Sequence, residues 1–257
     1  MTNNKQRREI VLPGEDLNRE LRRRTRRAFL TGGAATLAGW GAYKWLTGAP
    51  QEDDMPWPQR RMLHWNRKLA HAYLDDSHRM ATFSPNEVTY LKPNGDVGLD
   101  AAADAGGWKL TVAAEGSHPI ELRMEDLLAL PKTRMITRFC CIEGWDAIAS
   151  WGGVRFADFT KKFFPPGREL PAYVYMTTPD EEYYVGLDRK SALHPQTLLA
   201  YEQNEKPLVP EHGAPLRLVI PVKYGIKSIK RIGSIRYLST QPDDYWAEQG
   251  YDWFAGL

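Results

Sequence analysis

The sequence predicts an α+β fold: a single mixed α/β domain over residues 82–257, preceded by an N-terminal signal or anchor segment (1–47) and by a linker with one helix (48–81). Three observations lead to this prediction. Short β-rich runs alternate with short helical patterns from residue 82 onward. A chain of 257 residues can bury one substantial core. Its 42% apolar and 26% charged residues are ordinary for a globular protein.

Basic charge gathers at the N-terminus. Residues 1–47 hold ten Lys or Arg and four Asp or Glu, a net charge of +6. The rest of the chain holds 24 basic and 28 acidic residues, a net charge of −4. This distribution indicates a basic tail rather than a basic binding face on the main domain, so we expect no nucleic-acid partner.

The basic tail contains an export motif. Arg26–Leu30 (RRAFL), followed by a mildly apolar run rich in Gly and Ala, resembles a twin-arginine signal. This resemblance implies the twin-arginine translocation machinery as a partner, which exports proteins already folded, and a periplasmic location. The alternative is a membrane anchor with its positive charge on the inner side. The uncharged residues 28–43 are short for a full span, and cleavage of the signal stays open.

After a linker over residues 48–56, the pattern predicts the elements in order. Met62, Trp65 and Leu69 recur at helical spacing within Pro58–Tyr73, which predicts an amphipathic helix packed on the main domain. Strands are expected at residues 108–112, 134–142, 172–178 and 216–222. Helices are expected at residues 124–130, 156–164 and 192–201.

The only two cysteines, Cys140 and Cys141, are adjacent. Neighbouring cysteines rarely form a disulfide, and two alone cannot build a tetrahedral zinc site. They end the strand expected at 134–142 and enter a turn that contains Gly144. A thiolate held there suits a soft or high-valent metal centre. The alternative is a buried cysteine that serves as a small apolar side chain.

A second cluster is basic. Arg217, Lys223, Lys227 and Lys230 lie within fourteen residues, separated by glycine and small residues. Arg binds phosphate through two N–H groups, Lys binds as a point charge, and a glycine turn exposes backbone N–H groups to an anion. The pattern therefore favours a phosphorylated cofactor, with a solvated basic turn as the alternative.

Together the two clusters show a resemblance to a known family. The motifs that carry it are Cys141–Trp145 (CIEGW), Trp151–Val154 (WGGV), His212–Arg217 (HGAPLR) and Lys223–Gly225 (KYG). They resemble the molybdopterin-binding domain of the sulfite-oxidase superfamily over roughly residues 82–240. The C-x-E-x-W form is most similar to the catalytic subunits of periplasmic methionine-sulfoxide reductases.

The resemblance implies a molybdenum–molybdopterin cofactor, with Cys141 as the protein ligand of the metal and Glu143 as a catalytic candidate. It also implies a set of cofactor-binding residues: Asn86, Tyr90, Thr178, His212, Arg217, Ser228, Ile229 and Lys230. Two positions depart from the reductase pattern. Cys140 stands where the reductase has arginine, and His212 stands where it has asparagine, so the substrate stays open.

The activity implied is two-electron oxygen-atom transfer, with reduction of S-oxides such as protein methionine sulfoxide favoured. The alternatives are a sulfite dehydrogenase or oxidase and a cofactor-free exported binding module. No haem-attachment CxxCH, dinucleotide loop or P-loop occurs in the sequence. We therefore expect a separate electron-transfer partner, either a membrane haem protein or a soluble cytochrome. Because the chain ends soon after these motifs, we do not expect the dimerisation domain common in sulfite oxidases.

Overall fold

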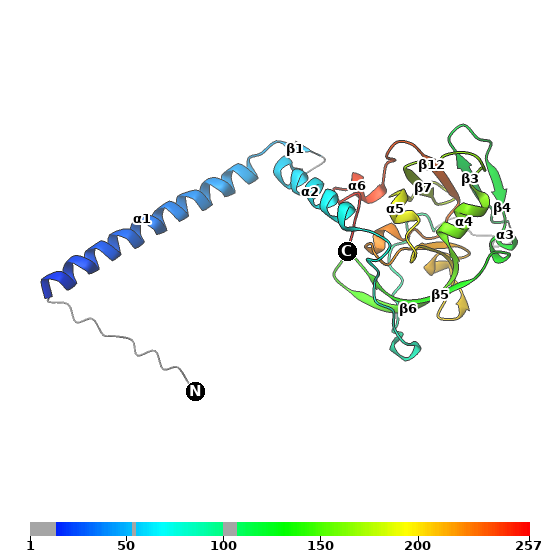
Figure 1. Cartoon of the computed structure of the whole chain (residues 1–257), viewed down its shortest axis with the longest axis horizontal. Helices are drawn as coiled ribbons and strands as arrows, with labels where there is room; N and C mark the ends of the chain where they lie inside the picture. Colours follow the sequence, from blue (N-terminus) through cyan, green and yellow to red (C-terminus); the bar gives the residue numbers. More distant parts are fainter. Residues whose placement is uncertain (1–13, 53–54, 100–106) are drawn as a thin grey trace. The chain divides into compact units, whose positions relative to one another are not determined.

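The computed structural model describes residues 14–52, 55–99 and 107–257 (Figure 1). The chain divides into two compact units, residues 1–60 and 61–257. The first unit holds helix α1 (Gly14–Thr47) and a two-stranded ladder of β1 (Gln51–Glu52) and β2 (Met55–Pro56). Helix α2 (Trp57–Tyr73) begins in this unit.

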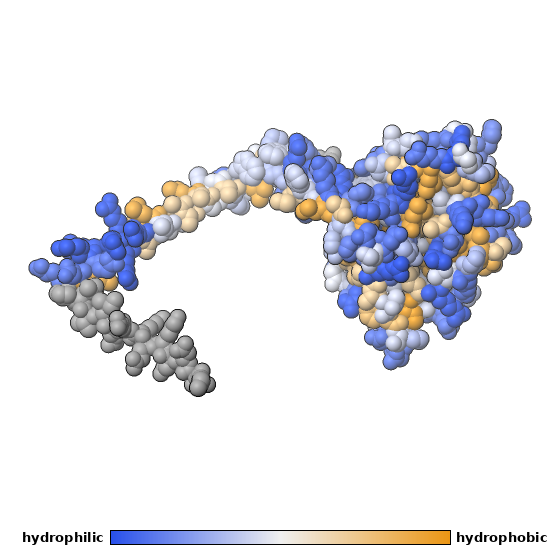
Figure 2. Space-filling model, in the orientation of Figure 1, coloured by the Kyte–Doolittle hydropathy of each residue, from blue (hydrophilic) through white to orange (hydrophobic). Residues whose placement is uncertain are grey.

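Helix α1 carries the twin-arginine-like motif. None of its residues is buried, and Glu20 forms salt bridges with Arg23 and Arg24. Figure 2 shows polar residues at its start and more apolar ones after them. Within the described ranges, no helix is both long enough and apolar enough to cross a membrane. The first thirteen residues of the expected export segment lie outside the described part of the chain.

The larger unit contains two five-stranded sheets among its described residues. In the first, β10, β9, β6 and β5 are neighbours in that order, β11 also pairs with β9, and every pairing is antiparallel. Its strands are β5 (Thr133–Cys140), β6 (Asp146–Arg155), β9 (Leu198–Gln203), β10 (Lys206–Pro207) and β11 (Arg217–Val219).

The second sheet has the order β4-β3-β12-β7-β8, and only β3 and β12 are parallel. Its strands are β3 (Leu110–Ala114), β4 (Ile120–Leu122), β7 (Tyr173–Thr177), β8 (Tyr184–Asp188) and β12 (Ser234–Leu238). The expected mixed α/β class is therefore confirmed, and the described strands of the larger unit form one antiparallel sheet and one mixed sheet.

Short helices connect the strands. They are α3 (Met124–Leu128), α4 (Phe156–Phe163), α5 (Arg189–Ala192), α6 (Tyr245–Glu248) and the 3-10 turns η1 (Pro85–Glu87), η2 (Pro210–His212) and η3 (Gly225–Lys227). Helix α4 belongs to the main core, where Phe156 and Phe159 are fully buried. The hydroxyls of Thr160 and Tyr237 lie 2.8 Å apart and join α4 to β12. A buried hydroxyl pair of this kind satisfies both polar groups inside the apolar core.

Most of the expected elements are present with shifted ends, but the helix expected at residues 192–201 is wrong. Helix α5 ends at Ala192, and residues 198–203 form strand β9. Leu198, Leu199 and Ala200 are all buried because each face of β9 packs on a hydrophobic cluster, Leu199 on one face and Leu198 and Ala200 on the other. A strand covered on both faces lacks the alternation that distinguishes it from a buried helix, so periodicity alone could not decide this segment.

Helix α2 forms as expected, but a different face packs on the domain. Ala70 lies against the main core and Leu74 is buried. Met62, Trp65 and Leu69, which were expected to face the domain, are exposed. The helical period is the same for both faces, so the sequence pattern identifies an apolar stripe without saying what covers it.

Candidate active site

The thiol of Cys141 lies at the end of a rigid strand. Strands β5 and β6 pair over their whole length, from Thr133 opposite Gly153 to Cys140 opposite Asp146. Cys141 follows at once and opens the turn between the two strands. Its N–H donates to the Trp145 carbonyl at 2.9 Å, and its carbonyl accepts from the Gly144 N–H at 3.1 Å. The side chain is buried, so the turn holds the sulfur in one place.

Glycines in the WGGV motif shape the sheet that carries this turn. The register of β6 against β9 shifts between Gly152 and Gly153. A Cβ at Gly153 would lie 2.1 Å from the Leu199 carbonyl oxygen, and no real side chain fits there. The motif is therefore required for close approach of two backbones at a bulge.

One polar group contacts the Cys141 sulfur, and a second hydrogen bond lies in the same turn. The side-chain amide of Asn94 donates to Cys141 Sγ at 3.6 Å. Trp145 Nε1 donates to the Glu143 carboxylate at 3.0 Å. Hydrogen bonds from Trp145 and then from Asn94 lower the pKa of Glu143. A thiol, an amide and an ionised carboxylate therefore lie together at this turn, and the lowered pKa makes Glu143 a hydrogen-bond acceptor.

Cys140 has different surroundings from Cys141. Its side chain is only partly buried, and the structure pairs it with no other sulfur. Burial, and then the negative charge of Asp146, raise the pKa of the Cys140 thiol. The neutral thiol is therefore the favoured form of Cys140.

Arg217 forms the centre of a positive cluster. It is buried at the start of β11, and its guanidinium donates to the carbonyls of His212 at 3.0 Å and Ser228 at 3.2 Å. The ring centroids of Trp151 and Phe139 lie 5.0 and 5.7 Å from its guanidinium carbon. Burial lowers its pKa to about 10. In the described part of the chain, no carboxylate forms a salt bridge with it.

Lys230 and His212 complete the cluster. Lys230 Nζ donates to the Gly95 carbonyl at 2.7 Å. Burial, and then the charge of Arg217, lower the pKa of Lys230 to about 8. Burial, followed by Arg217 and Lys230, also lowers the pKa of His212. Arg217 thus acts on both Lys230 and His212, and Lys230 acts on His212, so the three basic groups form one positive cluster.

A segment of backbone, residues 94–99, connects the thiol to the basic cluster, and we call it the strap. Asn94 at its start contacts Cys141, and the next carbonyl, that of Gly95, accepts from Lys230. Near its end, Gly98 has a φ of +76°, and a Cβ there would lie 2.6 Å from Thr178. The strap therefore passes directly over the end of β7.

The strap was not predicted, although Pro93-Asn94-Gly95 is a recognisable turn motif. That motif indicates a change of chain direction and gives no information about what the turn contacts. Asn86 and Tyr90, the positions expected to contact the pterin, are both exposed. Among the described contacts, Asn94 reaches the Cys141 sulfur and neither of these two does. Their roles stay predictions.

Thr178 is buried, and its hydroxyl donates to Asp180 at 2.5 Å and accepts from the Tyr183 N–H at 3.1 Å. It stands under the strap, next to Gly98. Its hydroxyl thus organises the loop after β7. A direct cofactor contact through this side chain stays a prediction.

The stretch 228–230 contributes mainly through its backbone. The Ser228 carbonyl accepts from Arg217, and the Ile229 carbonyl accepts from the Leu218 N–H at 2.9 Å. The Ile229 side chain belongs to the core. Only Lys230 extends its side chain toward the strap.

Lys223 and Lys227, the other two cations of the expected phosphate-binding stretch, do not join the cluster. Lys227 Nζ lies 2.5 Å from Asp244 Oδ2, and both side chains are buried. Lys223 Nζ donates to the Phe254 carbonyl at 2.8 Å. Both ammonium groups hold the C-terminal segment, so their presence in one cradle with Arg217 and Lys230 was a wrong expectation.

The donor set fits the cofactor that the motifs imply. A buried thiol with an amide donor beside it suits a soft metal ligand. Across the strap, Arg217 and Lys230 lack carboxylate hydrogen bonds among the described residues and have depressed pKa values. A bound phosphate group would neutralise the positive charges of Arg217 and Lys230, because anions compensate buried cations.

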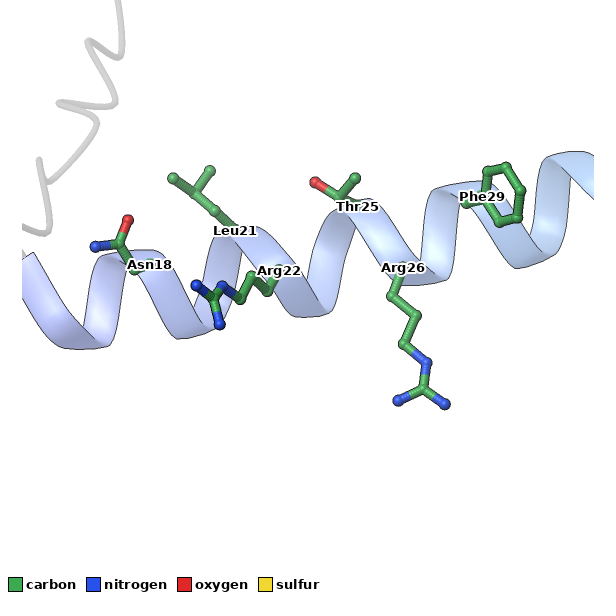
Figure 3. A pocket seen from close by; sticks show the side chains of 6 residues that line it. All are labelled: Asn18, Leu21, Arg22, Thr25, Arg26 and Phe29. Carbon is green, nitrogen blue, oxygen red and sulfur yellow. The ribbon is translucent and has the colours of Figure 1, made fainter.

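A separate depression lies along α1 (Figure 3). It encloses about 470 Å³ and is lined by Asn18, Leu21, Arg22, Thr25, Arg26 and Phe29. All six side chains belong to one exposed helix. A single helix face does not exclude water from a ligand, so the thiol-and-cation site remains the candidate active site.

Comparisons with known proteins identify the family of the chain. Residues 97–246 match the family model described as the oxidoreductase molybdopterin binding domain. A putative protein-methionine-sulfoxide reductase subunit from Azospira oryzae is 33% identical over 249 residues, which cover 94% of this chain and 92% of that protein.

Other relatives match in part. The protein-methionine-sulfoxide reductase catalytic subunit MsrP of Campylobacter jejuni is 36% identical over 172 residues, 58% of this chain and 56% of that protein. The chain thus spans about half the length of that relative. A solved structure, the sulfane dehydrogenase SoxCD from Paracoccus pantotrophus, matches with a TM-score of 0.48 at 17% identity over 54% of this chain and 40% of its own. The family model matches more than half of the chain, and one relative matches it over nearly the full length of both proteins. The chain therefore belongs to the family of oxidoreductases with a molybdopterin-binding domain.

Proposed function

We propose that this chain is an exported molybdenum-cofactor oxidoreductase that reduces S-oxides, such as protein methionine sulfoxide, by two-electron oxygen-atom transfer. The observation that carries the proposal is the turn in which Cys141 Sγ, Asn94 and the ionised Glu143 meet. The names of the relatives support the substrate class, since those from Azospira oryzae and Campylobacter jejuni are both called protein-methionine-sulfoxide reductase subunits.

The cofactor, when bound, supplies the two-electron oxygen-atom transfer chemistry. The protein supplies binding and position. Cys141 offers the metal its one protein sulfur, and the Asn94 amide stabilises that sulfur as a thiolate by donating to it. Arg217 and Lys230, which bond to the His212 and Gly95 carbonyls, would hold the phosphate of the pterin. The ionised, exposed Glu143 carboxylate would accept a hydrogen bond from the substrate or from water.

The reaction requires a source of electrons. Reduction of a sulfoxide breaks the sulfur–oxygen bond, takes up two electrons and two protons, and releases the sulfide and water. The electrons come from a separate partner, a membrane haem protein or a soluble cytochrome. The protons come from solvent, to which Glu143 is exposed, and its lowered pKa makes this carboxylate a hydrogen-bond acceptor beside the thiol.

The proposal includes a location. Residues 1–47, with Arg26–Leu30, would direct export of the folded protein to the periplasm through the twin-arginine machinery. Residues 48–81 would serve as linker and helix, and residues 82–257 as the catalytic domain. The basic charge of the first segment supports this assignment, because basic residues precede the apolar part of export signals.

The test is the metal content and activity of full-length protein from a cofactor-competent host. We expect near-stoichiometric molybdenum and pterin, and reduction of methionine sulfoxide with a reduced dye as electron donor. Cys141→Ser should lower this activity at least about 100-fold, because a ligand of the metal is lost. Cys140→Ser is the matched control, one residue away, and should retain bound molybdenum.

Sulfite oxidation is measured in parallel with an oxidised dye. Activity on sulfite alone would replace the reductase proposal by a sulfite dehydrogenase. Folded protein without molybdenum and pterin would show instead a binding module that keeps the fold.

A further inference from the structure

Helix α2 carries an apolar stripe that the described residues of its own unit leave exposed. Met62, Trp65, Leu69 and Tyr73 are 60%, 61%, 65% and 67% exposed. They recur every three or four residues, so they lie on one side of the helix. The stripe spans about 16 Å at 1.5 Å per residue. Four large apolar side chains in a row are more than the scattered exposure that is usual on a soluble surface.

The domain-facing side of α2 is distinct from the stripe. Leu63 is partly buried, Ala70 packs on the main core and Leu74 is buried. The carbonyl of His71 also accepts from Lys190 at 3.2 Å. Because this other side anchors the helix to the domain, the stripe faces away while the helix stays in place.

The charges of α2 all have one sign. Between Trp57 and Tyr73 the sequence has four Arg or Lys residues and no Asp or Glu. Arg61 and Lys68 lie beside the stripe by helical geometry, and both are exposed. The Lys68 ammonium lies 5.4 Å from the centroid of the Trp65 ring. The surface is therefore apolar with a cationic border.

A small cavity extends the apolar surface beyond the C-terminal end of the stripe. It holds about 200 Å³, and Tyr73, Leu74, Val222, Phe254 and Leu257 are among the residues that line it. It opens beside Tyr73, so the apolar surface continues from the helix onto the domain.

We propose that α2 binds an anionic phospholipid surface, with the stripe in the interface and Arg61 and Lys68 at the headgroups. Aromatic side chains at the apolar side and cations without acidic neighbours are the combination that interfacial helices use. Anionic lipid supplies the charge that is complementary to these cations. This association is independent of the cofactor and brings the catalytic domain to the membrane surface without requiring a spanning helix.

The test uses the full-length protein and vesicles of two compositions, phosphatidylglycerol with phosphatidylethanolamine, and phosphatidylcholine alone. Binding is measured by co-sedimentation, and hydrogen exchange resolved to peptides reports on residues 61–73 separately from α1. We expect slower exchange in residues 61–73 on the anionic vesicles only, and weaker binding at high salt.

Two variants separate the apolar and the electrostatic contributions. Trp65→Ser with Leu69→Ser should weaken binding to anionic vesicles about tenfold, because the largest apolar contacts are lost. Arg61→Glu with Lys68→Glu should abolish the slower exchange of residues 61–73 on anionic vesicles and weaken the preference for anionic lipid. The matched control, Asn66→Ser with Ala72→Ser, places two serines at exposed positions of the same helix and should bind as the parent does. Unchanged melting temperatures verify that the variants are folded.

Three outcomes would overturn the proposal. One is equal binding by the stripe variant and its control. Another is a hydrogen-exchange rate in residues 61–73 that is the same with and without vesicles. This outcome would also result if another segment or a second copy already protected the stripe in solution. The third is equal binding to both lipid compositions.

Discussion

At the scale of single residues, the basic cluster lowers the stability of the protein when no ligand is bound to it. Arg217 and Lys230 are buried or partly buried without a salt bridge among the described residues, and each lowers the pKa of His212. Burying charge without a partner is unfavourable. A bound phosphate would remove this cost, so the cluster couples cofactor binding to the stability of the protein.

Lys230 gives this coupling a pH dependence. Burial lowers its pKa from 10.5 to about 8. Between these values the unfolded chain binds more protons than the folded one, so the contribution of Lys230 to stability rises as pH increases from about 8 toward 10.5. Lys230→Gln should remove this rise in the cofactor-free protein and weaken phosphate binding. Urea unfolding at several pH values, with phosphate titration calorimetry, measures both effects.

The control for this variant is Lys206→Gln, which changes an exposed lysine on β10. It should leave the pH profile and phosphate binding unchanged. If the stability of Lys230→Gln depends on pH as that of the parent does, the pH dependence does not come from the burial of Lys230.

At the scale of elements, the strap decides whether the site exists. It brings Asn94 to Cys141 across 47 positions of sequence and Gly95 to Lys230 across 135. Its end needs close contact with Thr178, because a Cβ at Gly98 would lie within 2.6 Å of that side chain. The strap is thus held by backbone contacts at one end and polar contacts at the other.

Gly98→Ala tests this contact against a matched control. Gly98 and Gly95 have φ values of +76° and +74°, but a Cβ at Gly95 meets no atom within 4 Å. Both substitutions cost about 1–2 kcal/mol for the left-handed backbone. Gly98→Ala should cost about 1–3 kcal/mol more from the collision, and should release molybdenum from the purified protein. Chemical denaturation measures the stability of both variants, and metal analysis measures their molybdenum content. Equal stability and equal molybdenum content in the two variants would argue against a tight contact between the strap and Thr178.

At the scale of the whole catalytic unit, buried polar contacts attach the C-terminal segment to both the second sheet and the turn η3. Asp244 accepts from Lys227 Nζ, from the Gly186 N–H at 3.1 Å and from the Ala247 N–H at 3.1 Å. One carboxylate thus joins β8, η3 and α6. The lysine cannot be released from this arrangement to bind phosphate without leaving a buried carboxylate unpaired.

Asp244→Asn should therefore destabilise the protein by about 3 kcal/mol, because it leaves the buried Lys227 charge without its partner. The neighbouring Asp243 is exposed, and Asp243→Asn should change stability by less than about 0.5 kcal/mol. Urea denaturation of the two variants measures the difference. A loss of stability that is the same in both would show that the pair with Lys227 contributes little.

Sequence by itself determined the elements whose pattern is local and the motifs whose spacing is short. The helix at Trp57–Tyr73, the strand ending at the cysteines and the C-x-E-x-W turn could be predicted because helical period, strand alternation and turn residues act over a few positions. The same motifs were sufficient to predict the family, which the family-model match confirms.

Only the tertiary structure decided what these elements contact. Lys227 and Lys230 are three positions apart in sequence but bind different partners. Asn94 contacts Cys141, which lies 47 positions further along the chain. The stripe of Met62, Trp65 and Leu69 is exposed rather than packed on the domain. The tertiary structure also made residues 198–203 a central strand rather than a helix. The physical reason is that burial and charge pairing depend on which surfaces meet across long stretches of chain, and local propensity is too weak to determine those contacts.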